Sequence, residues 1–395
     1  MGTDAVIVAG ARTAVGTAFK GTLVHTDALE LGTAAVAEAV RRSGLDAELF
    51  DDVVLGESLY GGGAIGRYAA IEAGLVNAPG IAHNRHCASG LAAVQTAAAS
   101  IRSGMDKVVV AGGVQSSSTA PKAARKVPGT QDWEEDWLAP SHRETADAPI
   151  RDMTITVGWN AADRAGLTRE EMDAWAFRSH QRAIAGIDNG SFRDEIFALP
   201  VTLPDGTTGT FEVDEHPRRA STLEKLASLK PLHPEIEGFS ITAGNSAGVN
   251  DGAAAVVLTD RATAEAQGLA PLAVVRAWAS VGTPPAETGL APIKVIPKVL
   301  ERAGLTIGDI DLWEINEAFA SVPIAAVKAH GLDEDIVNVL GSGCSIGHPV
   351  AMTGTRMVLT LIHELRRRGG GTAVAAMCAG GGMASAVVLD VPAPA

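Results

Sequence analysis

One cysteine of this chain stands where nucleophilic chemistry is possible. Cys87, in HCASG, lies between a short apolar run and an alanine-rich helical stretch. The start of a helix offers free backbone N–H groups and a partial positive charge, and both favour a thiolate. Judged on position alone, a small buried core thiol is the commoner explanation.

Two further segments carry residues suited to acid–base work and to stabilising an oxyanion. His348 lies in GSGCSIGHP, a glycine-rich turn that leads from an apolar strand toward a helix. Cys378 ends another strand, before three glycines that begin with Gly380. A histidine near a cysteine activates it, and glycines bare backbone N–H groups for an oxyanion. A structural histidine and a tight turn are the plainer alternatives.

Asn316 ends an apolar strand where the first half of the chain has Gly56. This exchange hints at a function in one half only, although an Asn that caps the next helix explains it equally well. The cysteines show no C-x-x-C spacing, which argues against a zinc site. The turn before His348 has Ile346 where G-x-G-x-x-G needs a glycine, which argues against a dinucleotide site.

The chain repeats itself, and the repeat relates Cys87 to His348. Strands and helices alternate in both halves, which predicts an α/β fold. Three matches indicate a duplication, at offsets of 260, 264 and 268 residues: 44–57 with 304–317, 89–90 with 353–354, and 111–113 with 379–381. By the second offset His348 falls just upstream of the position equivalent to Cys87. If the halves pack about a pseudo-twofold axis, both turns converge on one cleft.

The duplication divides the chain into three expected units. Residues 1–116 and 251–270 form an N-terminal α/β half, and residues 271–395 form the C-terminal half. Residues 117–250 break the pattern and are expected to form a loop domain over the site. They include a helix with a capping box of Thr168 and Glu171, and a hairpin around Asp205-Gly206. In the second half, strands are expected at 272–280, 309–317, 335–343, 371–382 and 384–391.

Charge and composition exclude several classes of protein. The net charge is −14, and no basic run is long enough for a nucleic-acid surface. No apolar stretch reaches about 18 residues without polar breaks, so no membrane span is expected. The three cysteines and a start that reads directly as a strand predict a cytoplasmic protein without a signal peptide.

These segments together resemble the thiolase family. NRHCASG, NEAFA, GHP and CAGGG follow one another in that family's order, and TAGNSAGVNDGAAAV and TLEKLASLKP are also similar. The resemblance covers essentially the whole chain. It implies a layered fold of two duplicated α/β halves, with mixed five-stranded sheets, helices between and outside them, and an inserted loop domain.

The resemblance also implies catalytic roles. Cys87 takes the acyl group as a thioester, and His348 accepts its proton and helps hold the oxyanion. Asn316 positions a water that completes a first oxyanion hole. Cys378 moves a proton at Cα of the second acyl-CoA. The backbone N–H groups of Cys87 and Gly380 form the second oxyanion hole.

The same resemblance implies a coenzyme A (CoA) site that departs from the family pattern. Its residues are expected to be Arg218, Ala243, Ser246, Ala247, Met153 and Phe319. Ala247 holds the place of a serine that contacts the pantetheine arm. Further departures, which leave the catalytic residues intact and bear on substrate fit, are Leu340, Cys344, Ala351, Thr154, Gly158 and Trp159.

The predicted activity is that of an acetyl-CoA C-acetyltransferase or 3-ketoacyl-CoA thiolase, in fatty acid or lipid metabolism. CoA is a substrate, so no bound cofactor or metal is expected, and a homodimer or homotetramer follows from family likeness. Three alternatives stay open. They are a thiolase for longer or bulkier lipid or sterol acyl chains, a catalytically weak acyl-CoA binding protein, and a cysteine hydrolase that would leave Cys378 without a role.

Overall fold

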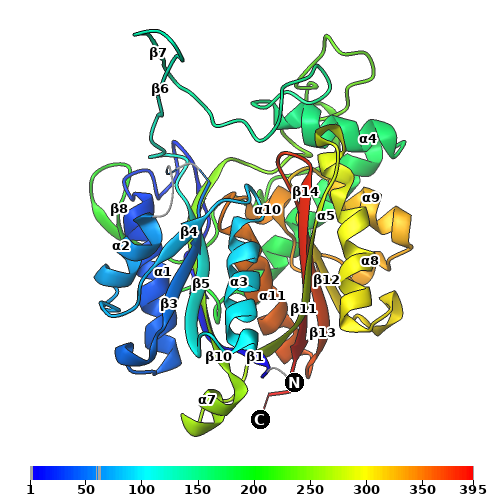
Figure 1. Ribbon diagram of the computed structural model, residues 1–395. Helices are drawn as coiled ribbons and strands as arrows, with labels where there is room; N and C mark the ends of the chain where they lie inside the picture. The colour runs from blue at the N-terminus through cyan, green and yellow to red at the C-terminus, as the bar shows by residue number, and fades with distance from the viewer. Residues whose placement is uncertain (1–2, 59, 61–63, 395) are drawn as a thin grey trace.

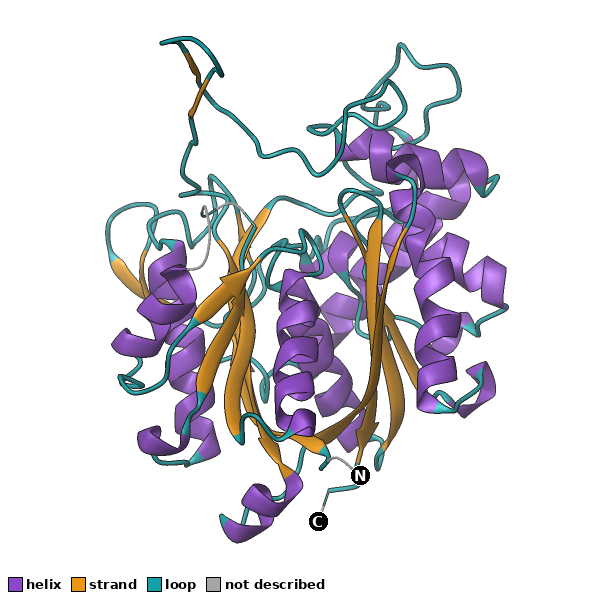
Figure 2. Cartoon of the chain, in the orientation of Figure 1, coloured by secondary structure: helices purple, strands orange, loops and turns teal. Residues whose placement is uncertain are grey.

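The computed structural model describes residues 3–58, 60 and 64–394. One mixed, ten-stranded sheet runs through the molecule and turns so that its two halves face each other (Figures 1 and 2). Two central helices, α3 (Ser89–Ser103) and α11 (Thr353–Arg367), fill the space between the halves. The outer faces are covered by α1 (Ala28–Ser43), α2 (Ala64–Glu72), α8 (Ala291–Ala303) and α9 (Ser321–His330).

The strand order is mirrored about the point where the two halves join. The first half runs β4-β3-β5-β10-β1, and the second runs β12-β13-β14-β11. Antiparallel pairs Val6–Val274 and Ile7–Ala273 join β1 to β11. The strands span Ala5–Arg12 (β1), Asp52–Gly56 (β3), Ile81–His83 (β4), Val108–Gln115 (β5), Asn250–Asp260 (β10), Ala273–Gly282 (β11), Leu312–Ile315 (β12), Gly371–Ala379 (β13) and Met383–Val391 (β14). The predicted duplication is therefore confirmed as a pseudo-twofold arrangement.

One of the three sequence matches is wrong. In the first half Ala111 pairs with Val54, and in the second Ala375 pairs with Glu314. Val54 and Glu314 are 260 residues apart, so the partner of Ala111 is Ala375, at an offset of 264. Residues 111–113 therefore correspond to 375–377. Short runs of Ala and Gly look alike, and the run at 379–381 belongs to the turn after β13.

The prediction of a strand at residues 335–343 is also wrong. A 3₁₀ turn, Glu334–Ile336, is followed by a single bridge between Val337 and Trp313. Asn338 then takes a left-handed conformation with φ of 50°. Its amide side chain accepts from the N–H of Ile315 and donates to its C=O, both at 2.8 Å. The Asn338 side chain thus makes the hydrogen bonds to the edge strand β12 that a further strand was expected to make. The second half has four strands among its described residues.

The middle of the chain is built as predicted in two places. Helix α5 (Arg169–Asp188) begins with the capping box of Thr168 and Glu171, and β8 pairs with β9 as a hairpin. The other short elements are β2 (Gly16–Thr17), β6 (Arg125–Lys126), β7 (Trp133–Glu134), β8 (Leu199–Thr202), β9 (Thr208–Phe211), α4 (Asn160–Arg164), α6 (Leu223–Ala227), α7 (Arg261–Ala266) and α10 (Gly343–Ile346). Among the described residues, no helix is long and apolar enough to cross a membrane.

The two central helices touch at a pair of glycines. A Cβ on Gly354 would lie 2.4 Å from the backbone nitrogen of Leu91, and one on Gly90 would lie 2.5 Å from the carbonyl oxygen of Ala351. Both distances are shorter than any real Cβ contact. Gly90 and Gly354 are equivalent positions at the 264-residue offset, so the helices cross on the pseudo-twofold axis near their N-terminal ends.

Replacing Gly354 with Ala is expected to lower the free energy of unfolding by about 1–3 kcal/mol, because overpacking forces the backbones of α3 and α11 apart. Thermal or urea unfolding measures the change. Gly282→Ala is the matched control, since a Cβ there meets no heavy atom within 4 Å. Equal stability of the two variants would show that the helix contact tolerates a side chain.

Candidate active site

Cys87 lies in the turn between β4 and α3, directly before the first turn of the helix. Its thiol is free and partly buried. Burial raises the pKa of this thiol, while the backbone N–H groups of Gly380 and of Cys87 itself act in the opposite direction. The Gly380 N–H therefore points at the Cys87 sulfur, and the two predicted segments meet in space.

His348 is held as a neutral base with a defined tautomer. Its backbone N–H donates to Asn250 Oδ1 at 3.0 Å, and its ring Nδ1 lies 2.7 Å from Thr353 Oγ1. The Thr353 hydroxyl donates its only proton to the carbonyl of Pro349 at 2.8 Å, so it accepts from Nδ1–H. Nε2 is left with a lone pair. Burial, with the Arg356 charge as a smaller cause, lowers the pKa of His348 to about 3.

Asn316 completes this side of the site. It is fully buried, and its Nδ2 lies 3.4 Å from His348 Nε2. Its Oδ1 has no hydrogen-bond partner among the described residues. A buried acceptor of this kind needs a donor such as a water or a substrate group. This fits the water-holding role that the resemblance implies for Asn316.

Cys378 lies beside Cys87. It is buried, and both its burial and the neighbouring Cys87 raise the pKa of its thiol. The chain then turns through Gly380, and Gly382 is tied down by a 2.9 Å bond from its N–H to Thr288 Oγ1. The four side chains of Cys87, His348, Asn316 and Cys378 are thus carried by the ends of elements from both halves of the fold.

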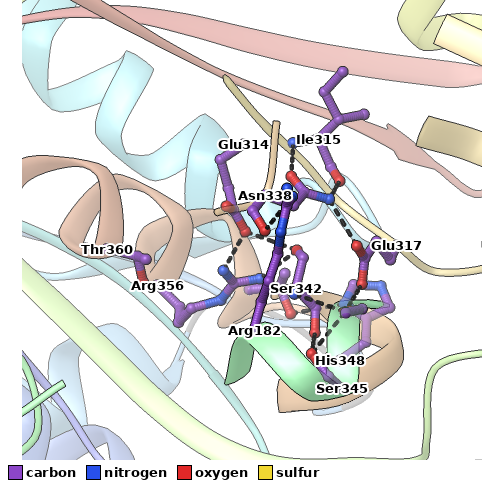
Figure 3. A network of polar contacts seen from close by, with 12 residues as sticks. Arg182, Glu314, Ile315, Glu317, Asn338, Ser342, Ser345, His348, Arg356 and Thr360 are labelled. Carbon is purple, nitrogen blue, oxygen red and sulfur yellow. Dashed lines mark hydrogen bonds and ion pairs between the residues drawn. The ribbon is translucent and has the colours of Figure 1, made fainter. Parts of the chain in front are cut away.

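A polar network beside His348 holds these elements in place (Figure 3). Glu314 pairs with Arg356, and both bond to the Ser342 hydroxyl. Glu317 meets no cation in an ion pair among the described residues. It accepts instead from four donors at 2.6–3.1 Å: Trp175 Nε1, Ser179 Oγ, Asn338 Nδ2 and the backbone N–H of Cys344. These contacts lock the end of β12 to the turn that carries His348.

A pocket of about 380 Å³ contains part of the predicted CoA site. Arg218, Ala243 and Ser246 line it, together with Cys344. Sequence reasoning missed two histidines in its wall, His180 and His216, and also Lys225. Burial, above all, lowers the pKa of each histidine to about 4. The histidines sit on a helix and a loop far apart in sequence, and no local motif identifies them.

The remaining predicted CoA residues lie outside that pocket wall. The backbone of Phe319 pairs with Ser246, and Ala247 donates its N–H to Ala318 at 3.0 Å, so both adjoin the pocket from behind. Met153 lines a different hollow of about 710 Å³, together with Glu57 and Asn84. The structure therefore groups three of the six residues in one pocket and places Met153 elsewhere.

Three departures from the family pattern have identifiable contacts in the structure. A Cβ on Gly158 would lie 2.8 Å from the ring of Phe319, so only glycine fits beside this buried ring. Trp159 stacks on Phe239 with ring centroids 5.3 Å apart. The Cys344 thiol donates to the carbonyl of Glu317 at 3.5 Å, and burial raises its pKa well above the ordinary value. Of the three, Cys344 lines the 380 Å³ pocket itself.

Comparison with known proteins identifies two family models along the chain. The N-terminal domain of thiolase matches residues 5–262, and the C-terminal domain of thiolase matches residues 269–391. An acetyl-CoA acetyltransferase of Pseudomonas aeruginosa is 42% identical over 98% of this chain and 99% of its own length. A 3-ketoacyl-CoA thiolase of Bacillus subtilis is 38% identical over the same shares.

Solved structures agree with these matches. The Bacillus anthracis acetyl-CoA acetyltransferase superposes with a TM-score of 0.89 at 37% identity, covering 99% of both chains. The human mitochondrial 3-ketoacyl-CoA thiolase gives 0.90 at 33% identity, covering 98% of this chain and 99% of its own.

Alkylation of Cys87 by iodoacetamide is expected to accelerate as pH rises through and beyond the ordinary thiol range of about 8.5. Burial raises the pKa of this thiol and lowers that of His348 to about 3, so His348 is uncharged at neutral pH and no thiolate–imidazolium pair forms there. Peptide mass spectrometry separates Cys87 from the buried Cys344 and Cys378, which should react more slowly. A flat, fast rate between about pH 5 and 7 would contradict this assignment.

Proposed function

The chain belongs to the thiolase family, and on that premise we propose that it transfers acyl groups between CoA thioesters through a thioester on Cys87. The observation that carries this proposal is the convergence of Cys87 with the neutral His348, with Asn316 and with the Cys378–Gly380 turn. A hydrolase needs only the first two. A second thiol beside the first, with its own backbone donors, suits a reaction that also removes a proton from carbon.

In the first half-reaction Cys87 is acylated. His348 Nε2 takes the proton from the Cys87 thiol, and the thiolate attacks the carbonyl carbon of the acyl-CoA. The N–H groups of Cys87 and Gly380 lie at the sulfur and hold the oxyanion that develops. When the C–S bond to CoA breaks, the leaving thiolate takes the proton back from His348.

In the second half-reaction a carbon–carbon bond forms. Once the second acetyl-CoA is bound, the Cys378 thiol passes its proton to His348 Nε2, and the resulting thiolate removes a proton from Cα; its raised pKa makes it a strong base for this task. The protonated His348 and a water on Asn316 Oδ1 then hold the enolate oxygen. The carbanion attacks the thioester on Cys87, and the Cys87 thiolate that leaves receives the proton from His348, which restores both thiols. Run backward, the same steps cleave a 3-ketoacyl-CoA with CoA.

The CoA moiety is proposed to lie in the pocket lined by Arg218, Ala243 and Ser246. Arg218 and Lys225 supply positive charge for its phosphates in a chain that is acidic overall. CoA acts as a substrate, so the mechanism calls for no bound cofactor or metal. The larger hollow, lined in part by Met153 and Asn84, supports the second candidate, a thiolase for longer or bulkier acyl chains, because Asn84 is close in sequence to Cys87.

We also propose a homodimer or homotetramer in the cytoplasm. The short edge strand β4 exposes Ile81, which is 49% accessible, and the β6–β7 hairpin stands away from the body with Trp133 59% accessible (Figure 1). An open strand edge and exposed apolar side chains favour association. The free cysteines fit a reducing compartment. Light scattering on the purified protein measures its molecular mass, and the mass of a monomer would contradict the proposed homodimer or homotetramer.

Incubation with CoA and acetoacetyl-CoA is expected to yield acetyl-CoA and an acetyl group on Cys87, detected by mass spectrometry. A series of 3-ketoacyl-CoA chain lengths then separates the two candidates. A rate that falls steeply beyond four carbons supports the acetyltransferase, and a rate that holds or rises supports the longer-chain enzyme. Acyl-CoA binding without thiolysis at any length would show a binding protein instead.

Cys378→Ala is expected to keep acylation of Cys87 but to lose condensation by about 10²–10⁴-fold, since it removes only the carbon base. Quenched-flow acetylation and acetoacetyl-CoA formation measure the two steps separately. Cys344→Ala is the matched control, because it also removes a buried thiol but leaves the carbon base in place. If Cys378→Ala condenses at the wild-type rate, Cys378 is not the base.

A further inference from the structure

Three arginines from separate elements surround one open hollow at the end of the molecule where β1 and β11 join. Arg102 lies in the last turn of α3, Arg302 in the last turn of α8, and Arg276 on β11. Trp278 and Ala277 complete the lining of this hollow, whose volume is about 250 Å³. None of these residues belongs to the active site or to its CoA pocket.

Each guanidinium is held in place by backbone carbonyls. Arg102 Nη1 donates to the carbonyl of Arg276 at 3.1 Å, and Arg302 Nη1 donates to that of Trp278 at 2.8 Å. Arg276 Nε and Nη2 both donate to Ala303 at 3.1 and 3.0 Å. The Arg102 guanidinium also lies over the Trp278 ring, 5.5 Å from its centroid. These bonds fix the positions of the three groups but use only some of their donors.

The hollow carries an excess of positive charge. Within ion-pairing distance, the described residues supply no carboxylate for Arg102 or Arg302. Arg276 has Asp390 at 3.4 Å, and its charge also contributes to lowering the pKa of Asp309, whose main cause is a hydrogen bond from Thr306. Two guanidinium charges are therefore uncompensated, in a chain whose net charge is −14. Like charges held together favour an anion between them.

We propose that this hollow binds a phosphate-class oxyanion. A guanidinium presents five donors in a planar fork that matches two oxygens of a phosphate. Arg102 and Arg302 each donate one of these N–H groups to a backbone carbonyl of β11, and their remaining donors can bind the ligand. The anion is either free phosphate or the phosphate of a small phosphorylated metabolite, and both present the same dianion to the arginines.

Isothermal titration of the purified protein with inorganic phosphate, in a buffer free of other oxyanions, tests the proposal. Saturable binding is expected. The double variant Arg102→Gln, Arg302→Gln should weaken it at least about tenfold, since each hydrogen bond to a charged group contributes about that factor. Arg102→Lys, Arg302→Lys keeps the charge without the fork and should bind between the two. Ribose 5-phosphate in place of phosphate distinguishes the sources: a tighter monoester indicates a phosphorylated metabolite, and equal affinity indicates free phosphate.

Two controls separate this hollow from general charge effects. Arg366→Gln removes an arginine from the last turn of α11 and should leave phosphate binding unchanged. Arg218→Gln alters the CoA pocket and should not abolish the signal. The proposal is overturned if phosphate shows no saturable binding, if the double Gln variant binds like wild type, or if Arg366→Gln weakens binding as much. The double Gln variant should keep the wild-type unfolding temperature and activity, because both residues are exposed and remote from Cys87.

Discussion

The close contact between α3 and α11 is the constraint on which the active site depends. Cys87 precedes one of these helices and His348 precedes the other, so the distance between the helix starts sets the distance between the proposed nucleophile and the proposed base. Gly90 and Gly354 allow the two backbones to touch. Gly113 on β5 adds a third close approach, because a Cβ there would lie 2.0 Å from the carbonyl of Ala351. Three segments from two halves therefore meet at one carbonyl, just behind the catalytic turns.

Burial makes the resting site electrically neutral at its reacting atoms. It raises the pKa of the Cys87 and Cys378 thiols and lowers that of His348, so the groups proposed to react carry no charge at rest. The charged side chains, Glu317 and the Glu314–Arg356 pair, form a layer behind the residues proposed to react. Buried charges of this kind contribute little net stability but strongly penalise any rearrangement that leaves them unpaired. The layer thus fixes the geometry, and in the proposed mechanism the reacting groups become charged only after substrate binds.

The duplication made most of this predictable, and its limits explain the errors. The convergence of the Cys87 and His348 turns was predictable because two copies of one strand-to-helix turn must face each other, whereas the roles proposed for Cys378 and Asn316 came from the family resemblance. The missing strand at Asn338 was not predictable, since VNVL has a strand's composition and only the tertiary structure shows the amide replacing the backbone. The lining of the pocket proposed to hold CoA was predicted only in part. His180 and His216 come from separate elements, and their proximity depends on packing that no spacing in the sequence records.

The departures from the family pattern leave the residues proposed for catalysis in place. Ala351 presents a backbone carbonyl to Gly90 and Gly113, so its side chain leaves the helix crossing intact. Gly158 makes room for Phe319, and Cys344 fills the pocket wall while its thiol bonds to Glu317. None of these changes touches the hydrogen bonds of His348 or the backbone donors at Cys87. Of these three residues, Cys344 lines the pocket proposed to hold CoA, so that departure bears most directly on substrate fit. The reacting groups stay fixed by the helix contact and by the charged layer behind them.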